Sequence, residues 1–389
     1  MKPMRLLVLT GELYPIPGNN TNLLFKLLPY LARNCEVRVL STAVSTNAKK
    51  RPSRFKGVPV YWISRDAVSS GKQKLVFPAV SKVFDPNGNS DVLNLLYIEE
   101  AIKHIRREYS FDAILSSSEP YPASAAAAMQ KAKRVLYLMD PPELVRNEKG
   151  TRFRNRNLNR ILSAQDAILT TPFIRDALLS HGMNELAHLI TPVGFPMVEE
   201  SARISMKRTK GHIRLLFSGW MCSQLRSPRY FLDIVSRLDQ RFEVTFMGKE
   251  CELLQKRFPI ETKATIVTLP NQPYETALQA MADADVLINI GNSVPVHMPS
   301  KTLEYINTGK PIVNFYKFAD CPTLYYTERY PLALNLFEEE KDLDAVTERF
   351  IRFCEENNGK TVDRMFIEAE YADCTPQYIA QKILECLEK

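Results

Sequence analysis

The sequence lacks the features that mark several large classes of proteins. Its 389 residues contain no apolar run close to the roughly 20 residues that cross a membrane, and the N-terminal stretch LLVLT is too short for the core of a signal peptide. With Gly 14 and Pro 25, the chain is neither collagen-like nor of low complexity. The seven cysteines are scattered and show no CxxC spacing, which favours reduced thiols over a disulfide framework or a zinc ribbon. We therefore expect a cytoplasmic globular protein.

Several short motifs for cofactors and nucleic acids are also missing. There is no GxGxxG fingerprint, which argues against a dinucleotide-dependent dehydrogenase, and no phosphate loop ending in Gly-Lys-Ser/Thr. No helix-turn-helix, RNP or zinc-finger pattern occurs, so we expect no nucleic-acid partner. No His/Asp cluster has the spacing of metal ligands, so we expect neither a metal nor another cofactor.

Positive charge is concentrated in the first half of the chain. The formal net charge is +9 for residues 1–200 and −2 for residues 201–389. The basic residues gather in KKRPSRFK (49–56), KQK (72–74) and RFRNRNLNR (152–160), with Phe55, Trp62, Phe77 and Phe84 among or near them. Such a surface suits anionic lipid headgroups, whereas the plainer interpretation is a solvated loop face. The residues alone leave both interpretations open.

Short apolar strands alternate with amphipathic helices along the chain. We expect strands near 5–10, 37–40, 113–116, 134–139 and 167–170, and a second series near 213–218, 243–247, 265–267, 286–290 and 311–315. This pattern is typical of parallel sheets covered by helices on both faces. It predicts an α/β fold of two doubly wound, Rossmann-like domains, 1–197 and 198–374, with a linker at 191–211. The last helix, within 375–389, is expected to pack back on the first domain.

Ligands of such sheets bind beyond the carboxyl ends of the strands, and four junctions there carry polar residues. The first, TGELYPIPGNNTN (10–22), contains Gly18 in a loop whose backbone N–H groups can meet an anion. The second and third, SSSEPYPASAAAA (116–128) and LYLMDPPELV (136–145), place Glu119 and Asp140 just past buried strands. Both acids suit sugar hydroxyls or an acceptor, although carboxylates that cap helices would look the same.

The fourth junction, INIGNSVPVHMPSKTLEYINTGKPIV (288–313), is the most informative. Pro299 and Ser300 open a short helix that carries Lys301 and Glu304 in its first turns. Lys301 and the backbone N–H groups suit a diphosphate, and Glu304 can accept two hydrogen bonds from a ribose diol. The plainer interpretation is a capped helix with a Lys–Glu pair on its surface.

The segment PSKTLEYINTGKPIV (299–313) resembles the signature of nucleotide-sugar-dependent glycosyltransferases of the GT-B fold, in particular their large, mostly retaining group. Further segments match in order along nearly the whole chain: VGFP (193–196), FSGWMCSQLRSP (217–228), FMGK (246–249) and ADADVLI (282–288). The resemblance implies two Rossmann-like domains that face each other across a cleft. The acceptor would bind the first domain and the nucleotide-sugar donor the second.

The resemblance also implies roles for single residues. Glu304 matches the carboxylate that binds the donor ribose, and Arg226, with Arg229 second, is nearest to the family's diphosphate-gripping lysine. The implied donor-binding set is Gly18, Ser218, Gly219, Arg226, Gly248, Pro299, Ser300, Lys301 and Glu304. The N–H groups of Ser218 and Gly219 would help Arg226 and the helix at Pro299 to stabilise the leaving phosphate.

Three positions depart from the family pattern. Val296 stands where the family has its first acid, and Trp220 stands where it has an arginine. Asp140 occupies the approximate place of the family's histidine in the first domain. The departure at Val296 bears on sugar preference and rate, because the family's first acid lies by the donor sugar.

The chain is therefore predicted to be an enzyme, a hexosyltransferase-type glycosyltransferase with a saccharide or lipid-linked acceptor in cell-surface polysaccharide synthesis. The resemblance favours retention, in which the departing phosphate takes the acceptor proton; inversion would need Asp140 or Glu119 as the general base. We expect a cytoplasmic protein with peripheral contact to an anionic membrane surface. A non-catalytic module that binds nucleotide sugar, and a nucleotide-sugar epimerase of the same fold, stay open as alternatives.

Overall fold

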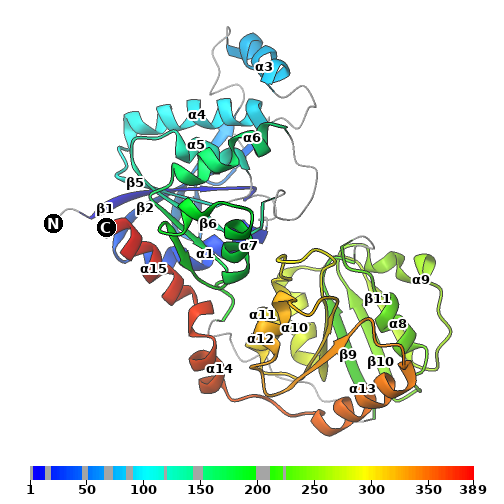
Figure 1. Cartoon of the computed structure of the whole chain (residues 1–389). Helices are drawn as coiled ribbons and strands as arrows, with labels where there is room; N and C mark the ends of the chain where they lie inside the picture. The colour runs from blue at the N-terminus through cyan, green and yellow to red at the C-terminus, as the bar shows by residue number, and fades with distance from the viewer. Residues whose placement is uncertain are drawn as a thin grey trace. The chain divides into compact units, whose positions relative to one another are not determined.

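The chain forms two compact units (Figure 1). The computed structural model describes residues 3–13, 19–45, 51–64, 73–84, 91–117, 121–142, 152–198, 211–221 and 225–389. Unit 1 comprises Met1–Pro196 and Asp373–Lys389, and unit 2 comprises Met197–Ala372. The α/β fold class predicted from the alternation of strands and helices is confirmed.

Unit 1 is built on a sheet whose described strands have the order β3-β4-β2-β1-β5-β6-β7-β8. Only the β3–β4 pair is antiparallel. Strands β1, β5 and β7 are buried almost throughout, because helices cover both faces of the sheet. The strands are β1 Met4–Thr10, β2 Cys35–Ser45, β3 Arg54–Phe55, β4 Val58–Ser64, β5 Ala113–Ser117, β6 Lys133–Leu138, β7 Ala167–Thr170 and β8 Ile190–Pro192.

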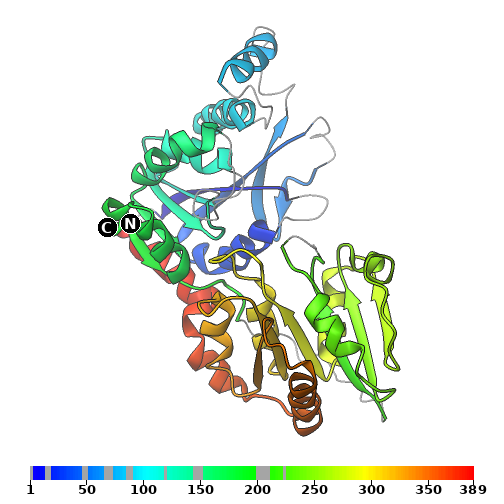
Figure 2. The same cartoon turned by 45° about the vertical axis from the view of Figure 1, so that its right-hand side comes forward.

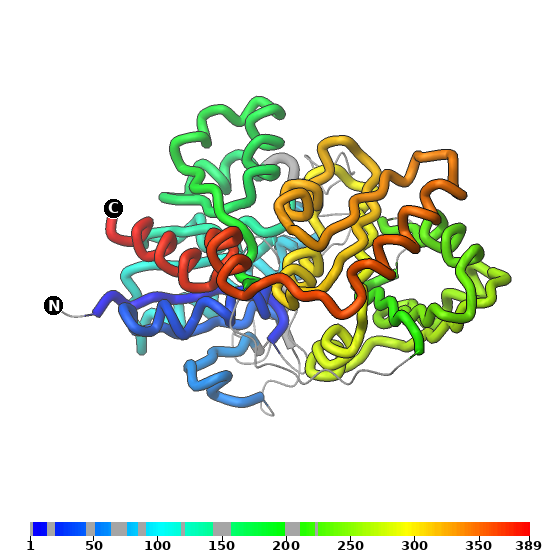
Figure 3. The backbone as a smooth tube through the Cα atoms, turned by 90° about the horizontal axis from the view of Figure 1, so that it is seen from below, coloured from blue at the N-terminus to red at the C-terminus, as the bar shows by residue number. Residues whose placement is uncertain are grey.

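The helices of unit 1 cover the two faces of this sheet. They are α1 Asn19–Leu31, α3 Gln73–Phe84, α4 Asp91–Glu108, α5 Tyr121–Ala128, α6 Arg152–Ser163, α7 Pro172–Ser180, η2 Asn184–Leu186 and α15 Pro376–Glu388. Helices α4 and α5 lie on one face, and α3 lies beyond α4, farther from the sheet (Figure 2). The C-terminal α15 packs against α1 on the other face (Figure 3).

Unit 2 contains a fully parallel sheet of order β11-β10-β9-β12-β13-β14. Its strands are β9 Ile213–Ser218, β10 Phe242–Met247, β11 Thr265–Leu269, β12 Val286–Ile290, β13 Ile312–Tyr316 and β14 Ala333–Phe337. This is the strand order 3-2-1-4-5-6 of a Rossmann domain. Its order reverses between β9 and β12, and the carboxyl ends of these two strands therefore mark the expected ligand position.

The helices of unit 2 pack on its sheet through a core rich in phenylalanine. They are α8 Arg229–Val235, η3 Cys251–Leu253, α9 Leu254–Arg257, α10 Tyr274–Asp283, α11 Lys301–Thr308, α12 Pro322–Thr327, α13 Leu343–Asn357 and α14 Arg364–Glu370. The short helix η4 Ala372–Cys374 begins at the last residue of unit 2 and continues into unit 1. Phe231 of α8 contacts Phe246, Phe315 and Phe350, with ring centroids 5.7, 5.2 and 6.1 Å away. This cluster holds α8 and α13 against the strands β10 and β13.

The amino ends of the strands are joined by three ion pairs of one construction, which are Arg5–Asp112, Arg134–Asp166 and Arg214–Asp285. Each arginine is the second residue of a strand, and each aspartate directly precedes the neighbouring strand. The aspartate accepts from both the main-chain N–H and the guanidinium of its arginine. These pairs fix the register of β1 with β5, of β6 with β7 and of β9 with β12.

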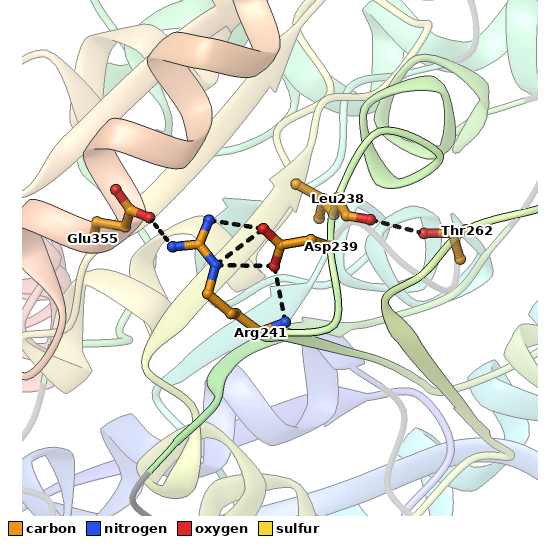
Figure 4. A network of polar contacts seen from close by, with 5 residues as sticks. All are labelled: Leu238, Asp239, Arg241, Thr262 and Glu355. Atoms are coloured by element: carbon orange, nitrogen blue, oxygen red, sulfur yellow. Dashed lines mark hydrogen bonds and ion pairs between the residues drawn. The ribbon is translucent and has the colours of Figure 1, made fainter.

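Arg241, just before β10, makes a looser contact of the same kind (Figure 4). Its Nη2 donates to Asp239 at 2.8 Å and its Nη1 to Glu355 of α13 at 2.6 Å. All three side chains are exposed to solvent, so the network joins α13 to the turn before β10 at the surface.

The linker and the cysteines can be compared with what the sequence predicts. The linker placed at 191–211 begins too early, since Thr191 and Pro192 belong to β8. Residues 199–210 of it lie outside the described part of the chain. The six described cysteines are all buried, and none of these six forms a disulfide.

Candidate functional site

The carboxyl ends of β9 and β12 carry the residues that the sequence assigned to donor binding. Ser218 ends β9 and is followed by Gly219, and Gly291 and Asn292 follow β12. Helix α11, which contains Lys301 and Glu304, begins shortly afterwards. The structure thus brings the site residues of unit 2 to the edge where the strand order reverses.

The end of β9 is fixed by a tyrosine from α11. The Tyr305 hydroxyl accepts a hydrogen bond from the N–H of Ser218 at 2.8 Å and donates to the carbonyl of Ser218 at 3.2 Å. Tyr305 is 1% exposed, and this burial raises its pKa above the ordinary value, which keeps the hydroxyl protonated. The sequence analysis missed this link because its partners are 87 residues apart.

Two main-chain N–H groups that the sequence analysis expected to meet the leaving phosphate already donate within unit 2. The N–H of Ser218 is engaged by Tyr305, and the N–H of Gly219 donates to the carbonyl of Met247 at 2.9 Å. Both donors thus have partners within the protein. A phosphate that bound to these two N–H groups would have to displace the partners that they have now.

Glycines directly follow β9 and β10, and the close contacts there require glycine at Gly248 and favour it at Gly219. Gly248 has φ +136, and a Cβ atom there would lie 2.0 Å from the carbonyl oxygen of Gly219. A Cβ atom on Gly219 would lie 3.1 Å from Nη1 of Arg226. The two glycines therefore allow the loops and the guanidinium to approach one another closely.

Arg226 is positioned by an asparagine that the sequence analysis did not name. Its Nε and Nη2 donate to Oδ1 of Asn292 at 3.1 and 2.9 Å. The amide nitrogen of Asn292, a residue only 3% exposed, donates to the carbonyl of His297 at 2.7 Å. Asn292 thereby links Arg226 to the loop before α11. The only feature of the sequence that pointed to Asn292 was its position, directly after a buried strand and a glycine. Arg229, the second candidate, instead lies over the ring of Phe258.

Helix α11 carries a buried acid rather than a surface pair. Lys301 and Glu304 form an ion pair, and their side chains are 25% and 7% exposed. A carboxylate this deeply buried needs its cation and further hydrogen-bond donors. The i, i+3 pair of the plainer interpretation is formed, but its carboxylate is buried and does not lie on the surface. Pro299 and Ser300 lie just before the helix, and Gly309, with φ +78, ends it.

Two of the three departures from the family pattern, Val296 and Trp220, have distinct local structures. Val296 has φ +61, a left-handed conformation that strains a β-branched residue. Trp220 is 43% exposed, its Nε1 donates to Glu250 at 2.9 Å, and the Lys249 ammonium lies 4.4 Å above its ring. The hydrogen bond from Trp220 and the ion pair with Arg257 hold the pKa of Glu250 below its usual value.

Unit 1 has its own polar residues at the carboxyl edge. Asp140 comes shortly after β6, and its Oδ2 accepts from Nδ2 of Asn20, in the first turn of α1, at 2.6 Å. Thr10 at the end of β1 donates to Thr21 at 2.9 Å. Gly18 and Glu119, both predicted site residues, lie outside the described residues.

One acidic motif escaped the sequence analysis. Asp283-Ala284-Asp285 has the D-x-D spelling of metal-binding transferases, but it lies at the amino end of β12, opposite the candidate site. Asp285 is the partner of Arg214 in one of the three structural ion pairs. Across the described residues, no three His, Cys, Asp or Glu side chains lie close enough to hold a metal ion.

The length and the apolar character of the helices bear on whether the chain crosses a membrane. Among the described helices, none combines the length and the apolar character that a membrane crossing requires.

Comparisons with known proteins define the fold. No protein-family profile and no curated protein sequence matches the chain. Solved structures do match, and all of the following do so over nearly full length. A lipopolysaccharide outer core galactosyltransferase, WaaB, in its apo form has 11% identity and a TM-score of 0.62, covering 98% of this chain and 99% of that one. HepE of Anabaena, in complex with UDP and glucose, has 13% identity and a TM-score of 0.61, with 99% and 97% covered. Sucrose-phosphate synthase of Thermosynechococcus elongatus has 11% identity and a TM-score of 0.68, with 99% and 98% covered.

This likeness establishes the architecture. The chain has the two Rossmann-like domains of the GT-B glycosyltransferase structures, which confirms the predicted fold class.

Proposed function

We propose that the protein is a glycosyltransferase that takes a sugar from a nucleotide-sugar donor bound to unit 2. The observation that carries the proposal is the buried pair Lys301–Glu304 in the first turns of α11, at the strand edge where Arg226 is held by Asn292. Glu304 can accept hydrogen bonds from the ribose hydroxyls of a nucleotide. The structures of HepE with UDP and with UDP-glucose support a UDP-sugar as the first donor to test.

The chemistry needed from the residues of unit 2 is charge stabilisation. Sugar transfer creates a cationic sugar while negative charge grows on the leaving diphosphate. Arg226 is the residue we propose to neutralise that charge, with Lys301 and the first N–H groups of α11 beside it. Asn292 keeps the guanidinium oriented, so little reorganisation is needed during the reaction. This arrangement needs no metal ion.

The stereochemical course we propose is retention. The departing phosphate would then take the proton of the acceptor hydroxyl, and no side chain would act as base. Asp140 of unit 1 has a different role in this proposal, to accept a hydrogen bond from an acceptor hydroxyl, in place of the Asn20 amide that it now accepts from. If the reaction inverts, Asp140 or Glu119 becomes the general base.

The acceptor we propose is a saccharide or a lipid-linked glycan in the synthesis of a cell-surface polysaccharide. The positive charge of residues 1–200 supports peripheral contact with an anionic membrane surface, where such a lipid acceptor resides. We place the protein in the cytoplasm, against the inner face of the membrane.

A thermal-shift panel of UDP, GDP, ADP, CMP and their common sugars tests the donor class. A ligand at 100 times its dissociation constant should add roughly 2.7 kcal/mol of stability. Glu304→Gln should lose the shift, whereas Glu348→Gln, an exposed acid on α13, should keep it. If no nucleotide stabilises the protein, the donor-binding proposal is wrong.

Chromatography of the same mixtures separates the enzyme from its alternatives. Release of the nucleoside diphosphate, by transfer or slow hydrolysis, supports the transferase. A bound but unchanged donor would indicate a non-catalytic binding module. Val296 and Trp220, which depart from the family pattern, are the residues that favour this alternative. A new isomer of the donor without any acceptor would indicate an epimerase.

A further inference from the structure

Helix α3 of unit 1 presents an apolar face to solvent. Val76, Val83 and Phe84 are 51%, 74% and 65% exposed. Val76 and Val83 are seven residues apart, so they lie on the same face of the helix. The adjacent face is anchored, because Phe77 is 8% exposed and packs edge-on against Tyr97 of α4 with ring centroids 5.5 Å apart. Phe84 comes seven residues after Phe77, at the last position of the helix, where this face is no longer covered. One side of α3 thus belongs to the core and the other does not.

Exposed large apolar side chains are more frequent on α3 than elsewhere in the described part of the molecule. Nine large apolar side chains are exposed among the described residues, and three of them belong to this single helix. Helix α3 also lies on the outer side of α4, away from the sheet (Figures 1 and 2). Contiguous exposed apolar surface on a folded protein marks an interaction site. None of the residues proposed for sugar transfer belongs to α3.

The sequence around the helix is strongly basic. Residues 49–84 contain nine Lys or Arg residues and a single acid, Asp66. Lys82 is exposed on α3 itself, and Arg54 and Lys56 are exposed beside β3. This one segment accounts for more than the net charge of +7 of the whole chain. A partner for it must combine negative charge with an apolar interior.

Of the two partners that a basic surface suits, a lipid bilayer fits better than a nucleic acid. A single-stranded nucleic acid stacks successive bases on several aromatic rings, and among the described side chains of α3 only one exposed ring, that of Phe84, is present. The indole of Trp62 is covered by the guanidinium of Arg51 at 4.8 Å, and its Nε1 donates to the carbonyl of Pro52. The exposed face of α3 instead offers Val76 and Val83, which match acyl chains.

We propose that α3 is a lipid-docking helix, which inserts Val76, Val83 and Phe84 at the boundary of an anionic bilayer while Lys82 and the basic residues near it in the sequence contact the headgroups. The inference rests on the lipid part of the proposed function and makes no use of the donor site. It names the surface that would hold unit 1 at the membrane.

Co-sedimentation of the full-length protein with vesicles tests the proposal. Vesicles of phosphatidylcholine with phosphatidylglycerol should bind the wild type at low salt, and pure phosphatidylcholine should bind it much less. The double change Val83→Glu and Phe84→Glu should weaken binding by about tenfold or more. Lys82→Glu should weaken it by about fivefold, and added salt should remove part of the attraction. Met365→Glu, the same change at a site 79% exposed on α14 of unit 2, should leave binding unchanged.

Three outcomes would overturn the proposal. The wild type fails to sediment with anionic vesicles; or the double variant binds as well as the wild type; or a single-stranded RNA binds with the same dependence on Val83 and Phe84. The melting shift with the best nucleotide, measured on each variant, separates this proposal from the donor proposal. Vesicle binding without any nucleotide shift would support the helix and reject the donor site, and the reverse result would do the opposite.

Discussion

The two ends of the strands in this molecule use charge in different ways. At the amino ends, three arginines each pair with one aspartate through both main chain and side chain, and these contacts hold neighbouring strands in register. At the carboxyl end of the unit 2 sheet, Arg226 is held by a neutral amide, and the carboxylate of Glu304 is buried beside Lys301. At the amino ends, each arginine is neutralised by its aspartate. At the carboxyl end, the amide of Asn292 that holds Arg226 carries no charge.

The difference shows how one architecture separates stability from function. An arginine that is already neutralised by an aspartate has little to offer a ligand anion, whereas a hydrogen bond to an asparagine orients a guanidinium without opposing its charge. The following variants test this contrast, from the largest expected effect to the smallest.

Arg226→Ala is expected to have the largest effect on the reaction. Loss of one preorganised donor to a developing anion lowers the rate by about 10²–10³. The release of nucleoside diphosphate from the donor measures this change. The melting temperature should move little, since Arg226 contacts a neutral partner near the surface. A large loss of stability with an unchanged rate would contradict the assignment of ligand binding to the carboxyl edge of the sheet and of stability to its amino edge.

Arg214→Ala should have the opposite profile. Its side chain and that of Asp285 are 18% and 13% exposed, and the substitution leaves a partly buried carboxylate with its main-chain donor alone. We expect a loss of about 2 kcal/mol in the free energy of unfolding, measured by urea titration. The nucleotide affinity should stay within twofold of the wild type, an order-of-magnitude bound of about 0.4 kcal/mol.

Tyr305→Phe should lower both the stability of the protein and its response to nucleotide, each by a smaller amount than the two arginine variants. It removes the hydroxyl that accepts from the N–H of Ser218, a buried donor, and should cost about 1 kcal/mol of stability. Because this hydroxyl fixes the end of β9 beside Gly219, the nucleotide-induced melting shift should fall too. Tyr316→Phe, on a partly exposed ring in the same sheet, is the matched control and should change neither quantity.

Arg241→Ala should matter least. Its pairs with Asp239 and Glu355 are exposed to solvent, where such contacts are worth about 0–1 kcal/mol and are screened by salt. Urea titration at low and at high salt should show a difference near the error of the measurement. A cost comparable to that of Arg214→Ala would contradict the distinction between buried and exposed pairs.

Part of this account could be predicted from the sequence alone. The alternation of apolar strands and helices predicts the parallel sheets, and the segment from Pro299 to Glu304 carries its own local signals in one short helix. The contacts that orient the site could not be predicted, because they join residues far apart in sequence. Tyr305 and Ser218 are 87 residues apart, and Arg226 and Asn292 are 66 apart.

Other misses have equally specific causes. The left-handed conformation of Val296 is unexpected for a β-branched residue. The D-x-D motif at Asp283 could be recognised as structural only once Asp285 was placed next to Arg214. The short strand β8 was assigned to the linker because three residues are too few to show periodicity.

Calorimetric titration of the best donor nucleotide into two variants tests the central claim most directly. Glu304→Gln changes the acid at the carboxyl edge, and Asp285→Asn changes an acid at the amino edge of the same sheet. We predict that Glu304→Gln loses most of the affinity, while Asp285→Asn binds as the wild type does despite a lower melting temperature. Equal affinities in the two variants, or a loss confined to Asp285→Asn, would contradict the assignment of the donor site to α11 and the ends of β9 and β12.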